Sequence, residues 1–207
     1  MPRLHAELAT TVNSHLAAVP PAQIRAFDEE ISAVPGLVKL TLGEPDFAVP
    51  DHVKKAAIES IQNDDSHYSS SKGKIELRKA ISKYLEQSRH VYYDPETEIV
   101  VTIGATEAVT ATTFAMLNPG DKVIIPTPAF SLYFPSVSLT GAEPIKVNTA
   151  EDGFLLSAER LEEVLAKEGP AVKAVLLNYP NNPTGRSYTE EELKALAKVI
   201  EDHHIYA

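Results

Sequence analysis

The sequence predicts an α/β protein in which a mainly parallel sheet carries helices on both faces. Short apolar segments alternate with amphipathic helical segments through the second half of the 207-residue chain. This alternation is typical of parallel strands joined by crossover helices, and strands that are apolar along their length are buried on both faces. In addition, glycine, proline or asparagine follows several of these strands, where sharp turns are needed.

Three helical segments are predicted in the first half of the chain. In each of them, apolar residues recur at the spacing of one helical face. These positions are Ile24, Phe27 and Ile31 in the first segment, Val53, Ala57 and Ile61 in the second, and Leu77, Ile81 and Leu85 in the third. Prolines punctuate the N-terminal region, so we expect the first helix to belong to an arm or a small subdomain.

The second half is predicted to alternate between strand and helix. We expect strands at EIVVTI (98–103), KVIIP (122–126), EPIKV (143–147) and AVKAVLL (171–177), with a further strand beginning at HIYA (204–207). All of these segments are short, mostly apolar and bounded by turn residues, as buried strands are.

The helices between these strands begin and end at recognisable signals. The first, at 105–117, stops at the turn residues NPGD. The next is expected to begin with Ser157 as its N-cap and to close at Gly169. The last opens with Thr189 and Glu192, which have the spacing of a capping box.

The composition disfavours several classes of function. A formal net charge of −10 would repel the phosphate backbone of nucleic acids. The absence of cysteine excludes disulfides, thiolate metal sites and a cysteine nucleophile. No apolar segment approaches the length of a membrane span, and the N-terminus lacks the apolar core of a signal peptide. We therefore expect a cytoplasmic protein that binds neither nucleic acid nor membrane.

Two further patterns carry little weight. His203 and His204 are adjacent, and adjacent side chains at a helix end diverge, so no metal site is predicted. Ser69 and Lys72 match the S-x-x-K spacing of serine acyl-transfer enzymes, but the companion motifs of those enzymes are absent from the sequence.

Two strand-end loops could bind a flat ligand that carries a phosphate. Gly104 permits a sharp turn, after which the amides of Ala105 and Thr106 lie open at a helix N-terminus, where anions bind. In the next loop, IPTPAFSLY, two prolines fix a bend with an expected cis Thr127–Pro128 bond, and Phe130 would project over the sheet end. Each feature alone is more often an ordinary turn or a core aromatic residue.

The third loop, NYPNNPTG, would supply polar groups to the same ligand. Asn178, Asn181 and Asn182 directly follow a predicted strand, and each amide offers both a donor and an acceptor. A cis Asn182–Pro183 bond would aim the amide of Asn182. Asparagine and proline are also common in loops without a function, so the prediction depends on all three loops meeting at the carboxyl ends of the strands.

Five segments resemble the class I aminotransferases among the fold-type I pyridoxal-phosphate enzymes. They are LGEPDF from Leu42, HYSSSKGKIELR from His67, GATEAV from Gly104, IPTPAFSLY from Ile125 and NYPNNPTG from Asn178. Their order and spacing match the family over nearly the whole chain. The resemblance implies an N-terminal arm and the start of a small domain at 1–48, and an incomplete cofactor-binding large domain at 49–207.

The resemblance also implies the cofactor pyridoxal 5′-phosphate and the residues that bind it. The amides of Ala105 and Thr106 would bind the phosphate, and Phe130 would stack on the pyridine ring. Asn182 would hydrogen-bond the phenolic oxygen of the cofactor and, with Gly43, would lie beside the substrate. The implied reaction moves an amino group between an amino acid and a 2-oxo acid.

The resemblance further implies a homodimer with shared active sites, because Tyr68 corresponds to a tyrosine that binds the phosphate of the neighbouring subunit. The family's catalytic lysine, and the aspartate and arginine that assist it, correspond to positions after Ala207, so no catalytic residue is predicted here. We expect a fragment that is inactive alone, in which the strand at 98–103 has no neighbour.

Two other functions remain open. One is a carbon–sulfur or related lyase of the same fold, since the motifs bind the cofactor more than they select a reaction. The other is a non-catalytic remnant or binding module that kept the scaffold. A product assay with a 2-oxo acid as acceptor separates the transferase from the lyase.

Overall fold

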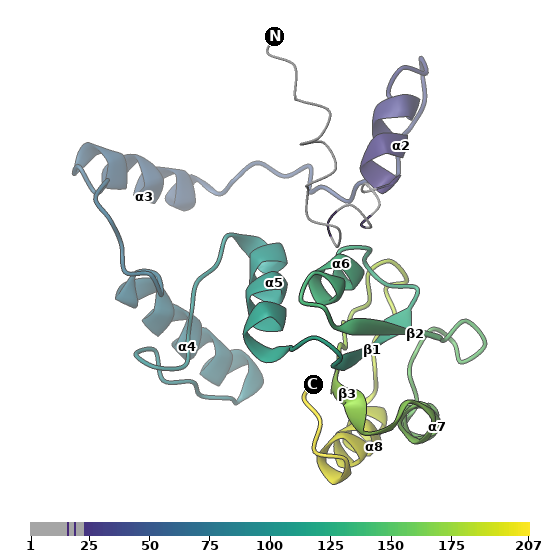
Figure 1. The fold of residues 1–207 in the computed structure, drawn as a ribbon. Coiled ribbons are helices and arrows are strands. Elements are labelled where there is room, and N and C mark those ends of the chain that lie inside the picture. Colours follow the sequence, from purple (N-terminus) through teal and green to yellow (C-terminus); the bar gives the residue numbers. More distant parts are fainter. Residues whose placement is uncertain (1–15, 17–18, 20–22) are drawn as a thin grey trace, which may run out of the picture. The chain divides into compact units, whose positions relative to one another are not determined.

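The computed structural model describes residues 16, 19 and 23–207, and the chain forms two compact units. One unit is Asp28–Ala105, and the other is Thr106–Ala207 together with N-terminal residues up to Phe27. The elements in chain order (Figure 1) are α2 (Gln23–Ile31), α3 (Asp51–Gln62), α4 (Ile75–Arg89), α5 (Gly104–Met116), β1 (Lys122–Thr127), α6 (Tyr133–Ser138), β2 (Glu143–Asn148), α7 (Ala158–Glu168), the 3₁₀ turn η2 (Gly169–Ala171), β3 (Val172–Val175) and α8 (Glu190–Asp202).

A parallel sheet in the order β2–β1–β3 forms the centre of the second unit. The first residue of β1, Lys122, pairs with the first residue of each neighbouring strand, Glu143 and Val172. The strands expected at KVIIP, EPIKV and AVKAVLL are confirmed. At the expected HIYA strand, Tyr206 forms a parallel bridge with Ala174, so strand pairing begins there as well.

Helices cover both faces of this sheet, as the sequence predicts (Figure 1). On one face, Ile124 of β1 packs in a core with Leu161 of α7 and Leu196 of α8. On the opposite face, Ile125 packs with Val137 of α6 in a second core. The alternation of side chains along a strand separates these two cores, because neighbouring residues of β1 point to opposite faces.

The helix caps of this unit are those that the sequence predicts. The Ser157 hydroxyl accepts a hydrogen bond from the Arg160 N–H (3.1 Å), and α7 ends at Gly169. At α8, the Glu192 N–H donates to the Thr189 hydroxyl (3.3 Å) and the Thr189 N–H donates to the Glu192 carboxylate (2.7 Å). The Thr189 hydroxyl also donates to this carboxylate (3.0 Å), and the two bonds from Thr189 hold the pKa of Glu192 below its ordinary value. The capping box is therefore confirmed.

The unit Asp28–Ala105 is organised around the side chain of Arg78 in α4. This side chain is buried, and its Nε donates to the Gly73 carbonyl (3.1 Å) while Nη1 donates to the Pro95 carbonyl. Gly73 has a φ of 92°, and a Cβ on it would lie 2.6 Å from the Cβ of Val101. Glycine is therefore required at this position, where the Lys72 carbonyl accepts the Val101 N–H (2.9 Å).

The strand expected at 98–103 is wrong. Residues 98–103 form no strand, and Ile103 is 91% exposed although Ile99 is buried. A strand is defined by a hydrogen-bonded neighbour, and the part of the chain described by the structure supplies none to this segment. The helix α6 was not predicted from the sequence; it is short and has Pro135 in its first turn.

Among the helices that the structure describes, none is long and apolar enough to cross a membrane.

We predict that Leu161→Ala destabilises the protein strongly. Leu161 is 0% exposed in the core between α7, α8 and the sheet, so truncation leaves a cavity. Large-to-small changes of this kind reduce the free energy of unfolding by about 2–5 kcal/mol. Urea unfolding measures the change, and Lys167→Ala on the exposed side of the same helix is the control. Equal unfolding midpoints for the two variants would contradict this packing.

Candidate functional site

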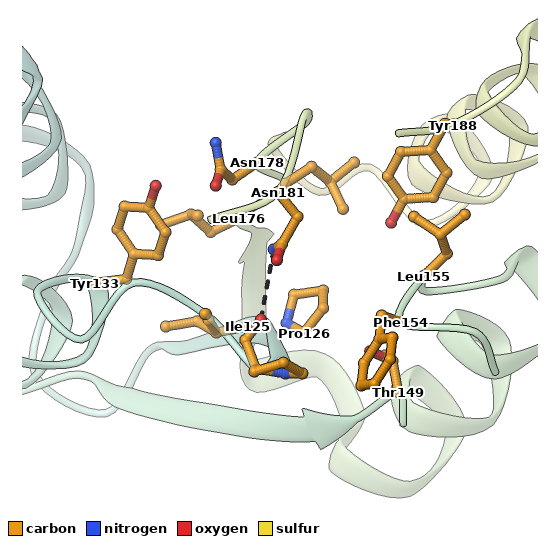
Figure 2. A pocket seen from close by; sticks show the side chains of 13 residues that line it. Ile125, Pro126, Tyr133, Thr149, Phe154, Leu155, Leu176, Asn178, Asn181 and Tyr188 are labelled. Carbon is orange, nitrogen blue, oxygen red and sulfur yellow. Dashed lines mark hydrogen bonds between the residues drawn. The ribbon is translucent and has the colours of Figure 1, made fainter. Parts of the chain in front are cut away.

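The loops that leave β1 and β3 meet at the carboxyl end of the sheet. Asn181, in the loop after β3, donates a hydrogen bond from Nδ2 to the carbonyl oxygen of Pro128, in the loop after β1 (3.4 Å). This bond is the dashed line in Figure 2. Two of the three loops predicted to form one site are thus joined directly.

The loop after β3 is shaped by hydrogen bonds of its own asparagines. The Asn182 N–H donates to Oδ1 of Asn178 (2.8 Å). Oδ1 of Asn181 accepts from both the N–H (3.1 Å) and the hydroxyl (2.8 Å) of Thr184. The Asn181 N–H donates to the Arg186 carbonyl (2.7 Å), which closes the turn. The loop is therefore a compact turn held by the side chains of Asn178 and Asn181.

Both expected cis peptide bonds, Thr127–Pro128 and Asn182–Pro183, are present. A further cis bond, Tyr179–Pro180, was not predicted from the sequence.

A third segment, between β2 and α7, joins the same end of the sheet. Thr149 is 1% exposed, and its N–H (3.0 Å) and hydroxyl (2.9 Å) both donate to the carbonyl of Thr127, the last residue of β1. Further along, Nε of Arg186 donates to the Gly153 carbonyl (3.0 Å). The Leu156 N–H donates to the hydroxyl of Tyr188 (3.1 Å). The segment is thereby bonded to the end of β1 and to the C-terminal part of the loop after β3.

Side chains from these three segments and from the adjoining strand ends line a small pocket that is partly open to solvent. Figure 2 shows Asn181 between Tyr133 on the side of the β1 loop and Tyr188 on the opposite side. Burial raises the pKa of both tyrosines above its ordinary value. Both phenols are therefore neutral at physiological pH and present apolar rings with a polar tip.

Two of the predicted site residues lie on these joined loops. Phe130 is half-buried and makes an edge-to-face contact with Tyr133, with ring centroids 5.7 Å apart and an interplanar angle of 81°. Asn182 is exposed, and its side-chain amide makes no hydrogen bond within the described part of the chain. A fixed ring and an available amide are suited to a flat ligand with a polar edge.

The predicted phosphate-binding residues occupy the first turn of α5. Gly104 begins the helix with a φ of 75°, and Ala105 and Thr106 after it are exposed. One turn beyond Thr106, the hydroxyl of Thr110 lies 3.5 Å from that of Ser136 in α6. Within the second unit, α5 therefore contacts the helix that follows the Phe130 loop.

The remaining predicted residues, Gly43 and Tyr68, belong to the unit Asp28–Ala105 and are exposed. Tyr68 is fully exposed.

Sequence reasoning missed Arg186 and Tyr188, which connect the β3 loop to the segment after β2. The bonding partner of Tyr188 is 32 positions away in the sequence. The local signal for Tyr188 was its aromatic side chain immediately before the N-cap of α8. An aromatic residue at this position is equally compatible with simple core packing.

Residues 35–207 match the family model for aminotransferase class I and II. The chain is 39% identical over 183 residues to a probable N-acetyl-LL-diaminopimelate aminotransferase of Bacillus subtilis, covering 88% of this chain and 46% of that protein. It is 34% identical to an aspartate aminotransferase of Pyrococcus abyssi, covering 94% and 49% of the two chains. The chain thus spans about half the length of the curated relatives that it matches.

Solved structures show the same similarity. A Pyrococcus protein called protein-A1 superposes with a TM-score of 0.87 at 35% identity, over 92% of this chain and 49% of that chain. The aspartate aminotransferase of Thermus thermophilus with maleate gives a TM-score of 0.80 at 34% identity, over 100% of this chain and 52% of that chain.

We predict that Asn181→Ala loosens the turn after β3. The substitution removes the acceptor of the Thr184 N–H and the bond to the Pro128 carbonyl. Loss of such bonds lowers the free energy of local opening by about 1 kcal/mol, so the Thr184 amide should exchange its hydrogen several-fold faster. Hydrogen exchange measures this, with the neighbouring Asn182→Ala as control. Equal exchange rates in the two variants would refute the role of Asn181.

Proposed function

The chain belongs to the aminotransferase class I and II family, and from this membership we propose that the protein transfers an amino group between an amino acid and a 2-oxo acid. The observation that carries the proposal is the junction of the β1 and β3 loops, which holds Phe130 and Asn182 at the same end of the sheet. Ligands of parallel α/β sheets bind at this end.

Three features of the chain fit pyridoxal phosphate. Phe130 is held by Tyr133, the amide of Asn182 is available, and the first turn of α5 is exposed. A flat ring needs a stacking partner, and a phosphate needs N–H donors such as those of a helix N-terminus. When bound, this cofactor withdraws electrons from the substrate bonds that change during amino transfer.

Each residue then has a defined task. The N–H groups of Ala105 and Thr106 bind the phosphate, where the helix dipole favours negative charge. Phe130 stacks on the ring. The Asn182 amide donates to the phenolic oxygen, which favours its ionised form, and Asn182 also contacts the substrate. Gly43 is assigned to the substrate as well.

We further propose a cytoplasmic homodimer in which Tyr68 binds the phosphate in the partner's site. The Tyr68 side chain is fully exposed within the described part of the chain, as this assignment requires of a residue that acts across an interface. The amino acid and 2-oxo acid are assigned only as classes. Relatives of this chain are named for different substrates, among them aspartate and aromatic amino acids.

We predict that Asn182→Ala impairs amino transfer without loss of stability. The amide makes no hydrogen bond within the described residues, so its removal leaves the packing unchanged. Loss of one hydrogen bond to a charged oxygen costs about 1.5–3 kcal/mol, which corresponds to roughly a 10- to 100-fold lower kcat/KM in the holoenzyme. Turnover with a 2-oxo acid acceptor and urea unfolding measure the two effects. Unaltered turnover at saturating cofactor would reject the role of Asn182.

We predict that Tyr68→Phe weakens retention of the cofactor by the dimer. The reason is that the hydroxyl binds the phosphate of the partner's site. Mixed dimers with Thr106→Asp, whose charge repels the phosphate, should regain one normal site, because both defects then fall on the other site. Cofactor titration of the mixed and unmixed dimers measures the recovery. Mixed dimers that bind no better than either parent would argue against shared sites.

A further inference from the structure

Tyr188 connects the β3 loop to the segment after β2. Its hydroxyl accepts the Leu156 N–H (3.1 Å), and its ring contacts Tyr179 edge-to-face at 5.4 Å between centroids. Tyr179 lies in the same loop as Asn182, three residues before it. A single side chain thus joins the segment after β2 to the loop that carries the available amide.

The segment after β2 is a rigid support for this contact. Leu156 is 1% exposed in the core formed with α7 and α8. Before it, the Phe154 N–H donates to the Thr149 carbonyl (2.8 Å), and Thr149 is itself bonded to the end of β1. Tyr188 therefore binds the β3 loop to a part of the chain that the sheet holds in place.

Arg186 makes a second connection between the same two segments. Its Nε donates to the Gly153 carbonyl (3.0 Å), and its own carbonyl accepts the Asn181 N–H (2.7 Å). The two connections restrain the loop at its C-terminal end. Asn181 restrains it on the side of β1 through the Pro128 carbonyl.

We propose that Tyr188 is a positioning residue for Asn182, a role that rests on the function proposed above. Tyr188 fixes the loop through Leu156 and Tyr179, and the loop in turn holds the Asn182 amide at the ligand. A phenylalanine would keep the ring contact with Tyr179 but would leave the buried N–H of Leu156 without its acceptor. The hydroxyl is therefore the group that the proposal concerns.

The first test follows the loop in protein free of cofactor. We expect the backbone N–H of Asn182 to exchange its hydrogen roughly three- to tenfold faster in Tyr188→Phe than in the unaltered protein. A change of this size is the effect of losing one hydrogen bond. Tyr92→Phe, which alters an exposed tyrosine in the other unit, is the matched control and should leave the rate unchanged. An unchanged rate in Tyr188→Phe would overturn the proposal.

The second test follows the cofactor in the holoenzyme. The pH at which the visible absorbance of the bound cofactor changes reports the hydrogen bond from Asn182, so Tyr188→Phe should shift it in the same direction as Asn182→Ala, but by less. In an Asn182→Ala background, Tyr188→Phe should cause no additional shift, because Tyr188 acts through Asn182.

These outcomes separate the two proposals. A lower melting temperature with no change in exchange or absorbance would show that Tyr188 is a packing residue only. An additional shift in the Asn182→Ala background would show that Tyr188 acts on the cofactor by another route, against the proposal. If the unaltered protein bound no pyridoxal phosphate, the proposed function would be wrong, while the exchange comparison would still decide whether Tyr188 fixes the loop.

Discussion

The hydrogen bonds accepted by the carbonyl groups at the end of β1 are the interaction on which the rest of this site depends. The Thr127 carbonyl accepts two hydrogen bonds from Thr149, and the next carbonyl, that of Pro128, accepts the side chain of Asn181. Two consecutive residues thus bind the segments that follow β2 and β3. Because β1 is the middle strand, its end is the one place from which both neighbours can be reached.

The opposite end of the sheet supports this arrangement by fixing where the strands start. Lys122 at the beginning of β1 is paired with Glu168 at the end of α7 (2.8 Å), and their hydrogen bond raises the pKa of Lys122 and lowers that of Glu168. Lys173 of β3 is paired with Asp121 (3.1 Å). A strand that slipped by one residue would break these pairs and would turn its apolar side chains to the wrong face. Between β1 and β2, whose register is continuous from Lys122 to Thr127, the pairing at one end therefore fixes the relative position of the strands at the other.

What the sequence predicts correctly is what depends on residues close together in the chain. The caps at Ser157 and Thr189 bond to N–H groups three positions away, so their residue types suffice to identify them. The segment 98–103 has the apolar composition of a strand, yet it forms none, because the described part of the chain lacks the hydrogen-bonded neighbour that a strand needs, as the family resemblance led us to expect. Tyr188 was missed for a related reason, because its bond to Leu156 exists only once β2, β3 and their loops are in place.

In the loop after β3, two asparagine side chains hold the backbone in place and a third stays available. Asn178 and Asn181 use their side chains to bond the loop's own backbone, and Asn181 also bonds the β1 loop. Asn182 contributes only its backbone N–H to the turn, so its side chain stays available at a position that its neighbours hold fixed. A binding group that is held in place before the ligand arrives loses little conformational entropy on binding. The hydrogen bonds of the loop thus decide which of three asparagines of the same chemistry keeps an available side chain.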